Sequence, residues 1–316
     1  MSFTSRLSNS WSLFKKSLAV MNAHPRLLVF PAVIFVFTLG ILGFFLAPVV
    51  LQPTGHSLRD PAHWSAVADS VFTKESIEAE RAAPGDRNGE RLVLTPKAMV
   101  YAILIYFASM FLATFFATAF YHEILSALQG GGVSIAGGLR FATSKLYAIV
   151  LWSLFAGLIG VLIRMLEERV GIIGKWIVRA IGIAWSVASV FAIPIIVSEE
   201  EANPIAILKR SAETLRKTWG ESLTGFLGIQ LGGGLVLIGS VVLFTLVGML
   251  AANLHIPILI IPFAILWLLC LFAFFYTMGV ASNIYRCALY LFAAQGEVPS
   301  YFDRESMDMA WKRKKS

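Results

Sequence analysis

The sequence has few charged residues and very little cysteine, and both shortages narrow the class of protein that it can encode. Charged residues make up 14% of the 316 positions, whereas 57% are hydrophobic and the mean hydropathy is +0.74. A typical soluble domain is about 25% charged, so this composition excludes a disordered chain and argues against a soluble globular enzyme. The two cysteines, Cys270 and Cys287, are too few for a disulfide scaffold or a cysteine-rich metal site.

Motifs that carry enzyme chemistry are also missing. The sequence has no His-Glu-x-x-His motif, no phosphate-binding glycine loop, no Cys-x-x-Cys pair and no Gly-x-Ser-x-Gly motif. We therefore expect a protein that is not an enzyme and that has no cofactor and no metal ion. His56 and His63 could bind a metal ion at the surface together with Asp60 or Asp69, but solvent-exposed loop histidines are the favoured interpretation.

Long apolar stretches occupy most of the chain instead. A transmembrane helix needs about 20 apolar residues, because it rises about 1.5 Å per residue through a hydrocarbon core of about 30 Å. Six stretches meet this length, over residues 27–51, 98–128, 146–166, 176–198, 223–252 and 258–294. The sequence therefore predicts an all-α, polytopic integral membrane protein with six transmembrane helices.

Both ends of the chain are basic, and this predicts their side of the membrane. The residues concerned are Arg6, Lys15, Lys16 and Arg26 before the first span, and Lys312, Arg313, Lys314 and Lys315 at the end. An even number of spans puts both ends on one side, which the positive-inside rule assigns to the cytoplasm of a cell membrane. We expect Lys15, Lys16 and the four C-terminal residues to contact anionic lipid headgroups or a protein partner. The net charge of +7 is attributed to this role, and no nucleic acid is expected as a partner.

Amphipathic segments precede the first, third and fifth spans. In residues 1–26 the apolar side chains recur every three or four positions, at Phe3, Leu7, Trp11, Phe14, Leu18 and Met21. A second segment starts at Ser134, and a third starts at Asn203–Pro204; serine and asparagine are preferred helix N-cap residues. The apolar stripe predicted for the third segment consists of Ile205, Leu208, Ala212, Leu215 and Trp219.

These segments indicate an internal repeat. Each unit has an amphipathic helix at the cytoplasmic interface followed by a pair of spans, although linkers can also be amphipathic by chance. Residues 27–294 are then the membrane domain and residues 295–316 a basic cytoplasmic tail. Residues 52–97 are a polar outer insertion, predicted to form a small, partly helical cap, with disorder as the alternative.

Polar residues near the predicted cytoplasmic ends of the spans are the candidate site. His122 and Glu123 end the second span, and Asn283 and Arg286 lie late in the sixth. Glu123 and Arg286 lie at comparable depth, so we expect that they can pair as a gate, a lipid-headgroup site or, preferably, a structural latch. The fifth span is rich in glycine and contains Gly232–Gly234. Close helix packing is favoured there over a cavity-lining break.

The favoured hypothesis for function is a non-enzymatic membrane protein that acts through contacts with lipids or other proteins, including copies of itself. The alternative is a transporter or channel for a lipid-like or small neutral solute. Proton-coupled transport usually needs an ionisable residue near the middle of the membrane, and the spans have none at an obvious midplane position.

Three sequence stretches carry a resemblance to a known family. They are IGIAWSVASVFAIPIIVSEEEANPIAILKRS at residues 181–211, WGESLTGFLGI at 219–229 and CALYLFAAQGEVPSYFD at 287–303. Together they resemble a prokaryotic family of six-helix membrane proteins that is catalogued as a domain of unknown function. That family is distantly similar to the membrane domain fused to some glycerophosphodiester phosphodiesterases. The resemblance implies a plasma-membrane protein with repeated helical pairs, and it implies no catalytic residues.

Overall fold

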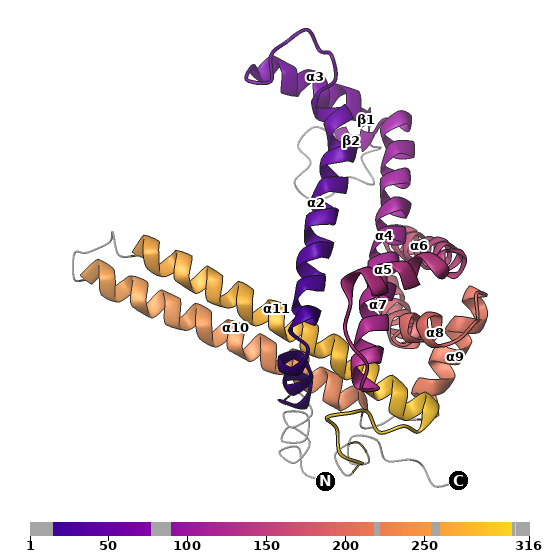
Figure 1. The fold of residues 1–316 in the computed structure, drawn as a ribbon. Coiled ribbons are helices and arrows are strands. Elements are labelled where there is room, and N and C mark those ends of the chain that lie inside the picture. Colours follow the sequence, from indigo (N-terminus) through magenta and orange to yellow (C-terminus); the bar gives the residue numbers. More distant parts are fainter. Residues whose placement is uncertain (1–14, 77–89, 218–221, 254–259, 305–306, 308–316) are drawn as a thin grey trace.

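The structure is a computed structural model, and it describes residues 15–76, 90–217, 222–253, 260–304 and 307. The described residues are mostly helical, which confirms the all-α class. Figure 1 shows long helices that diverge from a common base, with α10 and α11 projecting away from α2 and α4. We call this base, where the ends of the long helices meet the short ones, the helical base.

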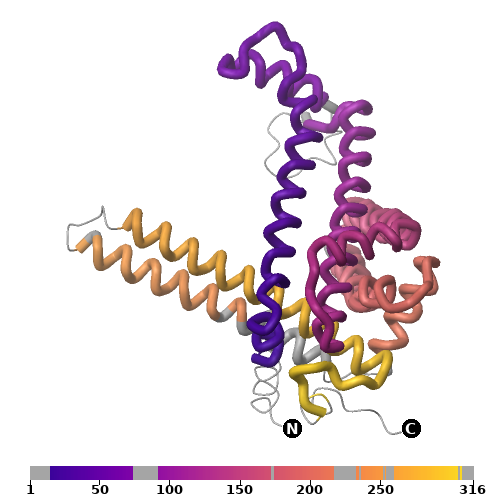
Figure 2. The backbone as a smooth tube through the Cα atoms, viewed as in Figure 1, coloured from indigo at the N-terminus to yellow at the C-terminus, as the bar shows by residue number. Residues whose placement is uncertain are grey.

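The chain enters the helical base through helical residues 15–23 and the 3₁₀ turn η1 (Pro25–Leu28). Helix α2 (Val29–Val50) follows and occupies the first predicted span. Figure 2 shows the first described residues beside the last ones. Lys16 there forms an ion pair with Asp303, and the ring of His24 meets that of Tyr301 edge to face.

The insertion after α2 contains both helix and strand. Helix α3 (Pro61–Val71) begins at Asp60, whose side chain accepts a hydrogen bond from the Ala62 N–H at 2.9 Å. Strand β1 (Phe72–Ser76) then pairs antiparallel with β2 (Glu90–Leu94), with Phe72 opposite Leu94. The predicted helical part of the insertion is confirmed by α3. The hairpin was not predicted, because these five-residue strands lack the regular apolar alternation that marks a strand.

Helix α4 (Pro96–Leu128) is followed by the short α5 (Ile135–Ser144), and then by α6 (Leu146–Arg169) and α7 (Ile172–Ala188). The predicted N-cap of α5 is confirmed, because the Ser134 side chain accepts a hydrogen bond from the Gly137 N–H at 3.1 Å. The predicted start of α9 (Pro204–Lys217) is confirmed as well. There the Asn203 side chain accepts a hydrogen bond from the Ile205 N–H at 3.0 Å.

The predicted fourth span is interrupted by a turn over residues 189–191, after which α8 (Ala192–Ser198) continues. Pro194 explains the interruption, since a proline has no N–H and its ring clashes with the carbonyl four residues earlier. The Phe191 N–H instead donates to the Ser211 hydroxyl of α9 at 3.0 Å. The turn is therefore fastened to α9, and α8 packs against both α4 and α9.

Helices α10 (Ser222–Asn253) and α11 (Ile260–Tyr290) contact each other, and α11 ends in the π-helical turn η3 (Leu291–Gln295). Five helical stretches among the described residues are long and apolar enough to cross a membrane: Pro25–Val50, Pro96–Leu128, Leu146–Arg169, Gly174–Ser198 and Ile260–Gln295. The apolar stretch described in α10, Val236–Ala251, is shorter than these five. The span over residues 223–252 therefore stays a prediction.

The buried core lies in the helical base and not along the long helices. It combines the start of α2, the C-terminal half of α4, parts of α5, α6, α8 and α9, and the end of α11. Its fully buried side chains include Phe30, Ile124, Ile149, Ile195, Ile207, Tyr285 and Tyr290. By contrast, α2, α10 and the first half of α11 expose large apolar side chains such as Phe44 and Phe272. Exposed apolar surface of this extent is typical of helices that face lipid.

Helix α9 is rotated relative to the predicted stripe. Its buried side chains are Ile207, Ser211, Thr214 and Leu215, whereas Ile205 is exposed, so the predicted stripe is wrong at Ile205. The rotation places the Ser211 hydroxyl against the turn before α8. There it accepts the hydrogen bond of the Phe191 N–H, which a continuous helix would direct to a backbone carbonyl. Trp219, the last residue of the predicted stripe, lies outside the described residues.

Candidate functional site

A cavity of about 470 Å³ lies between α10 and α11 near the helical base. The described residues that line it are Gly233, Gly234, Phe275, Met278, Gly279, Ser282 and Asn283. A Cβ atom added at Gly234 or Gly279 would meet no atom within 4 Å, and one at Gly233 would meet only Met278 Cε at 3.5 Å. The prediction of close packing in the fifth span is therefore wrong at Gly234. The alternative is right in that the glycines line a cavity, but α10 is one continuous helix and has no break there.

The residues of α11 that line the cavity form one helical face. Phe275, Met278, Gly279, Ser282 and Asn283 follow one another at spacings of three, one, three and one, the pattern of neighbouring positions on one side of an α-helix. Glycine at the centre of this face leaves the volume that a larger side chain would fill. The cavity thus has apolar walls and, at positions 282 and 283, a polar end.

A polar network continues from this end into the core. The Tyr121 hydroxyl of α4 donates a hydrogen bond to Asn283 Oδ1 at 2.9 Å, and Arg286 Nη1 donates to the Tyr121 oxygen at 2.9 Å. The structure therefore brings together Asn283 and Arg286 from the predicted cluster, with Tyr121 between them. Tyr121 was not predicted; its only signal in the sequence is a polar aromatic residue beside His122 at the end of a span.

The other two predicted residues lie elsewhere on α4. The His122 ring stacks on that of Phe141 in α5, with centroids 3.8 Å apart. Glu123 is buried and accepts a hydrogen bond from the Ser134 N–H at the start of α5. Each residue of an α-helix rotates the chain by about 100°, so Tyr121 and Glu123 point in nearly opposite directions. Arg286 bonds to Tyr121 rather than to Glu123 for this reason.

Glycine permits the contact between Glu123 and α5. A Cβ atom added at Gly138 would lie 2.7 Å from the Ala119 carbonyl oxygen and 2.9 Å from Glu123 Cγ. The carboxylate of Glu123 meets the N-terminal end of α5, where unpaired N–H groups and the helix dipole favour negative charge. This arrangement fixes α5 against α4, whereas the expected latch between Glu123 and Arg286 is wrong, because each has another partner.

A second polar cluster in the helical base was not predicted. Glu199 Oε1 accepts from the Tyr290 hydroxyl at 3.3 Å and lies 3.4 Å from Arg210 Nε. Lys145 Nζ donates to the Glu199 carbonyl oxygen and to Glu200 Oε1, each at 3.0 Å. These contacts join α8, α9, α11 and the start of α6. The cluster therefore connects four helices of the helical base to one another.

The predicted docking residues lie at the helical base or outside the described residues. Lys15 is exposed, and Lys16 pairs with Asp303. Lys312, Arg313, Lys314 and Lys315 lie outside the described residues.

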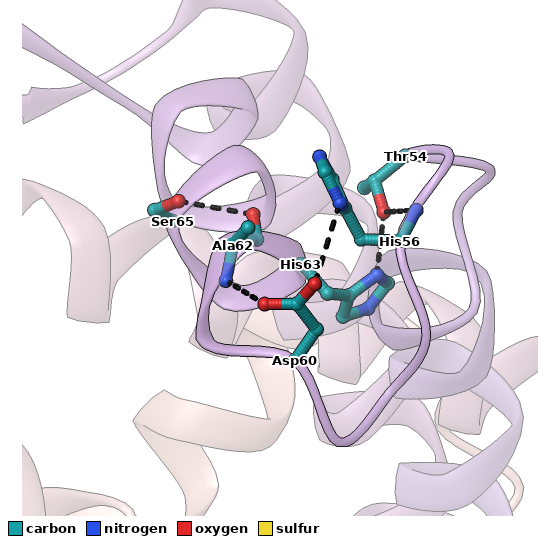
Figure 3. A network of polar contacts seen from close by, with 6 residues as sticks. All are labelled: Thr54, His56, Asp60, Ala62, His63 and Ser65. Atoms are coloured by element: carbon teal, nitrogen blue, oxygen red, sulfur yellow. Dashed lines mark hydrogen bonds and ion pairs between the residues drawn. The ribbon is translucent and has the colours of Figure 1, made fainter.

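The histidines of the insertion have structural contacts (Figure 3). His63 is only 2% exposed, so the expectation of a solvent-exposed loop residue is wrong for it, although His56 is exposed. The Nε2 atom of His63 lies 2.8 Å from the Val50 carbonyl oxygen, and its Nδ1 lies 2.6 Å from Thr54 Oγ1. The Val50 carbonyl oxygen can only accept, so Nε2 of His63 donates this hydrogen bond. Among the described residues no group of three or more His, Cys, Asp or Glu residues could hold a metal ion.

Comparison with known proteins identifies the family. The chain belongs to a family of unknown function, DUF6159, whose model matches residues 97–300. No curated protein and no solved structure matches the chain. The matched region contains the cavity, the Tyr121 network and the cluster around Glu199, whereas α2 and most of the insertion precede it.

Proposed function

We propose that this protein is a non-enzymatic integral membrane protein of the plasma membrane that acts through contacts with lipids or other proteins. The proposal includes six spans in three units, each preceded by an interfacial helix, with both termini in the cytoplasm. Support comes from the element order, in which residues 15–23, α5 and α9 each precede a pair of long apolar helices.

One observation carries the proposal: residues 15–23, α5 and α9 all contribute buried side chains to the core of the helical base. A helix that lies in the membrane interface buries its apolar face and leaves its basic side chains toward the headgroups. In α9 the exposed side chains include Lys209, Arg210 and Arg216, and Lys15 is exposed on the first short helix. This is the arrangement expected of a surface that contacts anionic headgroups.

Lipid enrichment tests this proposal. The full chain would be purified in mixed micelles of phosphatidylcholine and phosphatidylglycerol, and bound lipids counted by native mass spectrometry. Replacing Lys15, Lys209 and the four basic C-terminal residues by glutamine should lower phosphatidylglycerol enrichment, since each basic residue near an anionic surface contributes about 1 kcal/mol. A control replaces two other basic residues by glutamine, Arg164 in the last turns of α6 and Arg179 near the middle of α7. Equal phosphatidylglycerol enrichment in the wild type and in the variant with the six glutamine replacements would contradict the proposal.

A second candidate function, a transporter or channel for a lipid-like or small neutral solute, is favoured by the cavity between α10 and α11. This hypothesis requires an opening lined by glycines of the fifth span and polar residues of the sixth, and the lining residues are of those kinds. Transport by purified protein in liposomes would test it. The distant similarity to membrane domains fused to glycerophosphodiester phosphodiesterases stays a prediction and supplies no catalytic residue to either candidate.

A further inference from the structure

We infer that the cavity between α10 and α11 is a binding site for one membrane lipid. Its acyl chain would lie against Phe275, Met278 and the glycines, and acceptor oxygens of its ester or phosphate group would meet Ser282 and Asn283. The inference rests on the proposed membrane location but not on the basic residues of the helical base.

The volume and lining fit such a ligand. Small-molecule sites are usually concave, about 300–1,000 Å³ in volume, and mostly apolar with a few fixed polar groups. The cavity of about 470 Å³ falls in this range, and its polar groups are confined to two adjacent residues of α11. A lipid has the same division between a long apolar part and a short polar part.

The polar end offers hydrogen-bond donors. Ser282 is only 8% exposed, and it lines the cavity. Asn283 Oδ1 already accepts from Tyr121, so its amide N–H groups are the part left for a ligand. A ligand that accepts hydrogen bonds from the Ser282 hydroxyl and the Asn283 amide would have its polar end fixed at these two residues. The acceptor oxygens of a lipid ester or phosphate supply this chemistry.

The surroundings favour a lipid over a water-soluble solute. Phe275 lines the cavity and is itself 42% exposed, so the cavity wall continues into the outer surface of α11. The neighbouring outer positions are large and apolar, including Leu268, Leu269 and Phe272. An acyl chain can therefore pass from the bilayer to the cavity without leaving an apolar environment. A polar solute would have to cross that apolar environment to reach the cavity.

The test fills the cavity and measures retained lipid. The full chain would be reconstituted in nanodiscs of phosphatidylethanolamine and phosphatidylglycerol that contain a phosphatidylethanolamine with a photoreactive diazirine in its acyl chain. Gly279→Leu places a side chain in the open volume, and Gly239→Leu is the matched control, because a Cβ there also meets no atom within 4 Å and Gly239 does not line the cavity. We expect crosslinks at residues 275–282 in wild type and the control, and about tenfold fewer in Gly279→Leu, equivalent to about 1.4 kcal/mol.

The polar end is tested separately with Ser282→Ala, which removes one hydroxyl and adds no volume. It should lower crosslinking while leaving the thermal unfolding temperature of the lipid-free protein unchanged. Equal crosslinking in wild type, Gly279→Leu and Gly239→Leu, or no crosslink at these residues in wild type, would overturn the inference. A wild-type chain that does not enter nanodiscs would instead contradict the proposed membrane location, so the two failures are distinguishable.

Discussion

Glycines have opposite roles in two regions of this molecule. In the helical base, Gly138 lies so close to α4 that an added Cβ would meet a backbone oxygen at 2.7 Å. Further along α4 and α6, a Cβ added at Gly157 would meet the Phe107 ring at 2.9 Å. Between α10 and α11, an added Cβ at Gly234 or Gly279 would meet nothing within 4 Å. The first pair of glycines permits helices to approach, whereas the second pair leaves a space between them.

The difference shows that glycines in a helix do not by themselves indicate close packing against a neighbouring helix. Small residues allow close backbone approach only where a partner helix uses the room. At Gly138 the partner is α4, and the contact is reinforced by the buried Glu123. At Gly234 and Gly279 two glycines face a shared volume from opposite helices, so neither helix fills it. Substitutions should separate these cases by the sign of their effect on stability.

The largest effect is expected for Gly138→Val. The added side chain must displace the Ala119 carbonyl or the Glu123 side chain, and overpacking of this kind costs about 1–3 kcal/mol. Thermal unfolding of the detergent-solubilised chain should show a clear loss, near the upper end of that range. Gly234→Val is the matched control, and an equal loss in both variants would remove the distinction between the two regions.

Tyr121→Phe tests the link between the two regions and should have the next largest effect. It removes the hydroxyl that accepts from Arg286 and donates to Asn283. Loss of a hydrogen bond to a charged group costs about 1.5–3 kcal/mol, so we expect a loss of about 2 kcal/mol in chemical unfolding. Tyr147→Phe, at an exposed tyrosine of α6, serves as the control. An unchanged Tyr121→Phe protein would show that the network does not join α4 to α11.

Ser211→Ala tests whether the helical base depends on polar contacts as well as on packing. The variant leaves the buried N–H of Phe191 without its acceptor, which costs about 1–3 kcal/mol. We expect about 1.5 kcal/mol, together with faster amide hydrogen exchange in the turn over residues 189–191. Faster exchange confined to other segments would argue against this role for Ser211.

Gly234→Ala should have the smallest effect and the opposite sign. Alanine is favoured over glycine in a helix interior by about 0.5–1 kcal/mol, and no contact opposes the added methyl group. A slight rise in the thermal unfolding temperature is expected. A fall of the size seen for Gly138 variants would show that α10 is packed tightly at this position.

Much of the fold follows from local features of the sequence. The positions of α2, α4, α6 and α11 follow from apolar stretches of sufficient length, and the starts of α5 and α9 follow from Ser134 and Asn203 as capping residues. These features depend on neighbouring residues alone, which is why a single sequence was enough to predict them.

Other features depend on partners that are distant in the sequence. The buried face of α9 is set by the Phe191 N–H, and the burial of His63 is set by the end of α2. At the candidate site, Asn283 and Arg286 were predicted, but Tyr121 was not, because the choice between Tyr121 and Glu123 depends on how α4 is rotated toward α11. The roles of the glycines likewise depend on whether a neighbouring helix fills the space beside them.

The central claim, that the helical base is the cytoplasmic face of a membrane protein, is tested most directly by cysteine labelling in intact cells. Ser57→Cys lies in the insertion and Ser300→Cys lies at the helical base, and both positions are exposed. Each would be introduced into a chain in which Cys270 and Cys287 are replaced by alanine. A membrane-impermeant maleimide should label position 57 in intact cells and position 300 only after permeabilisation. Labelling of position 300 in intact cells, with position 57 protected, would contradict the account.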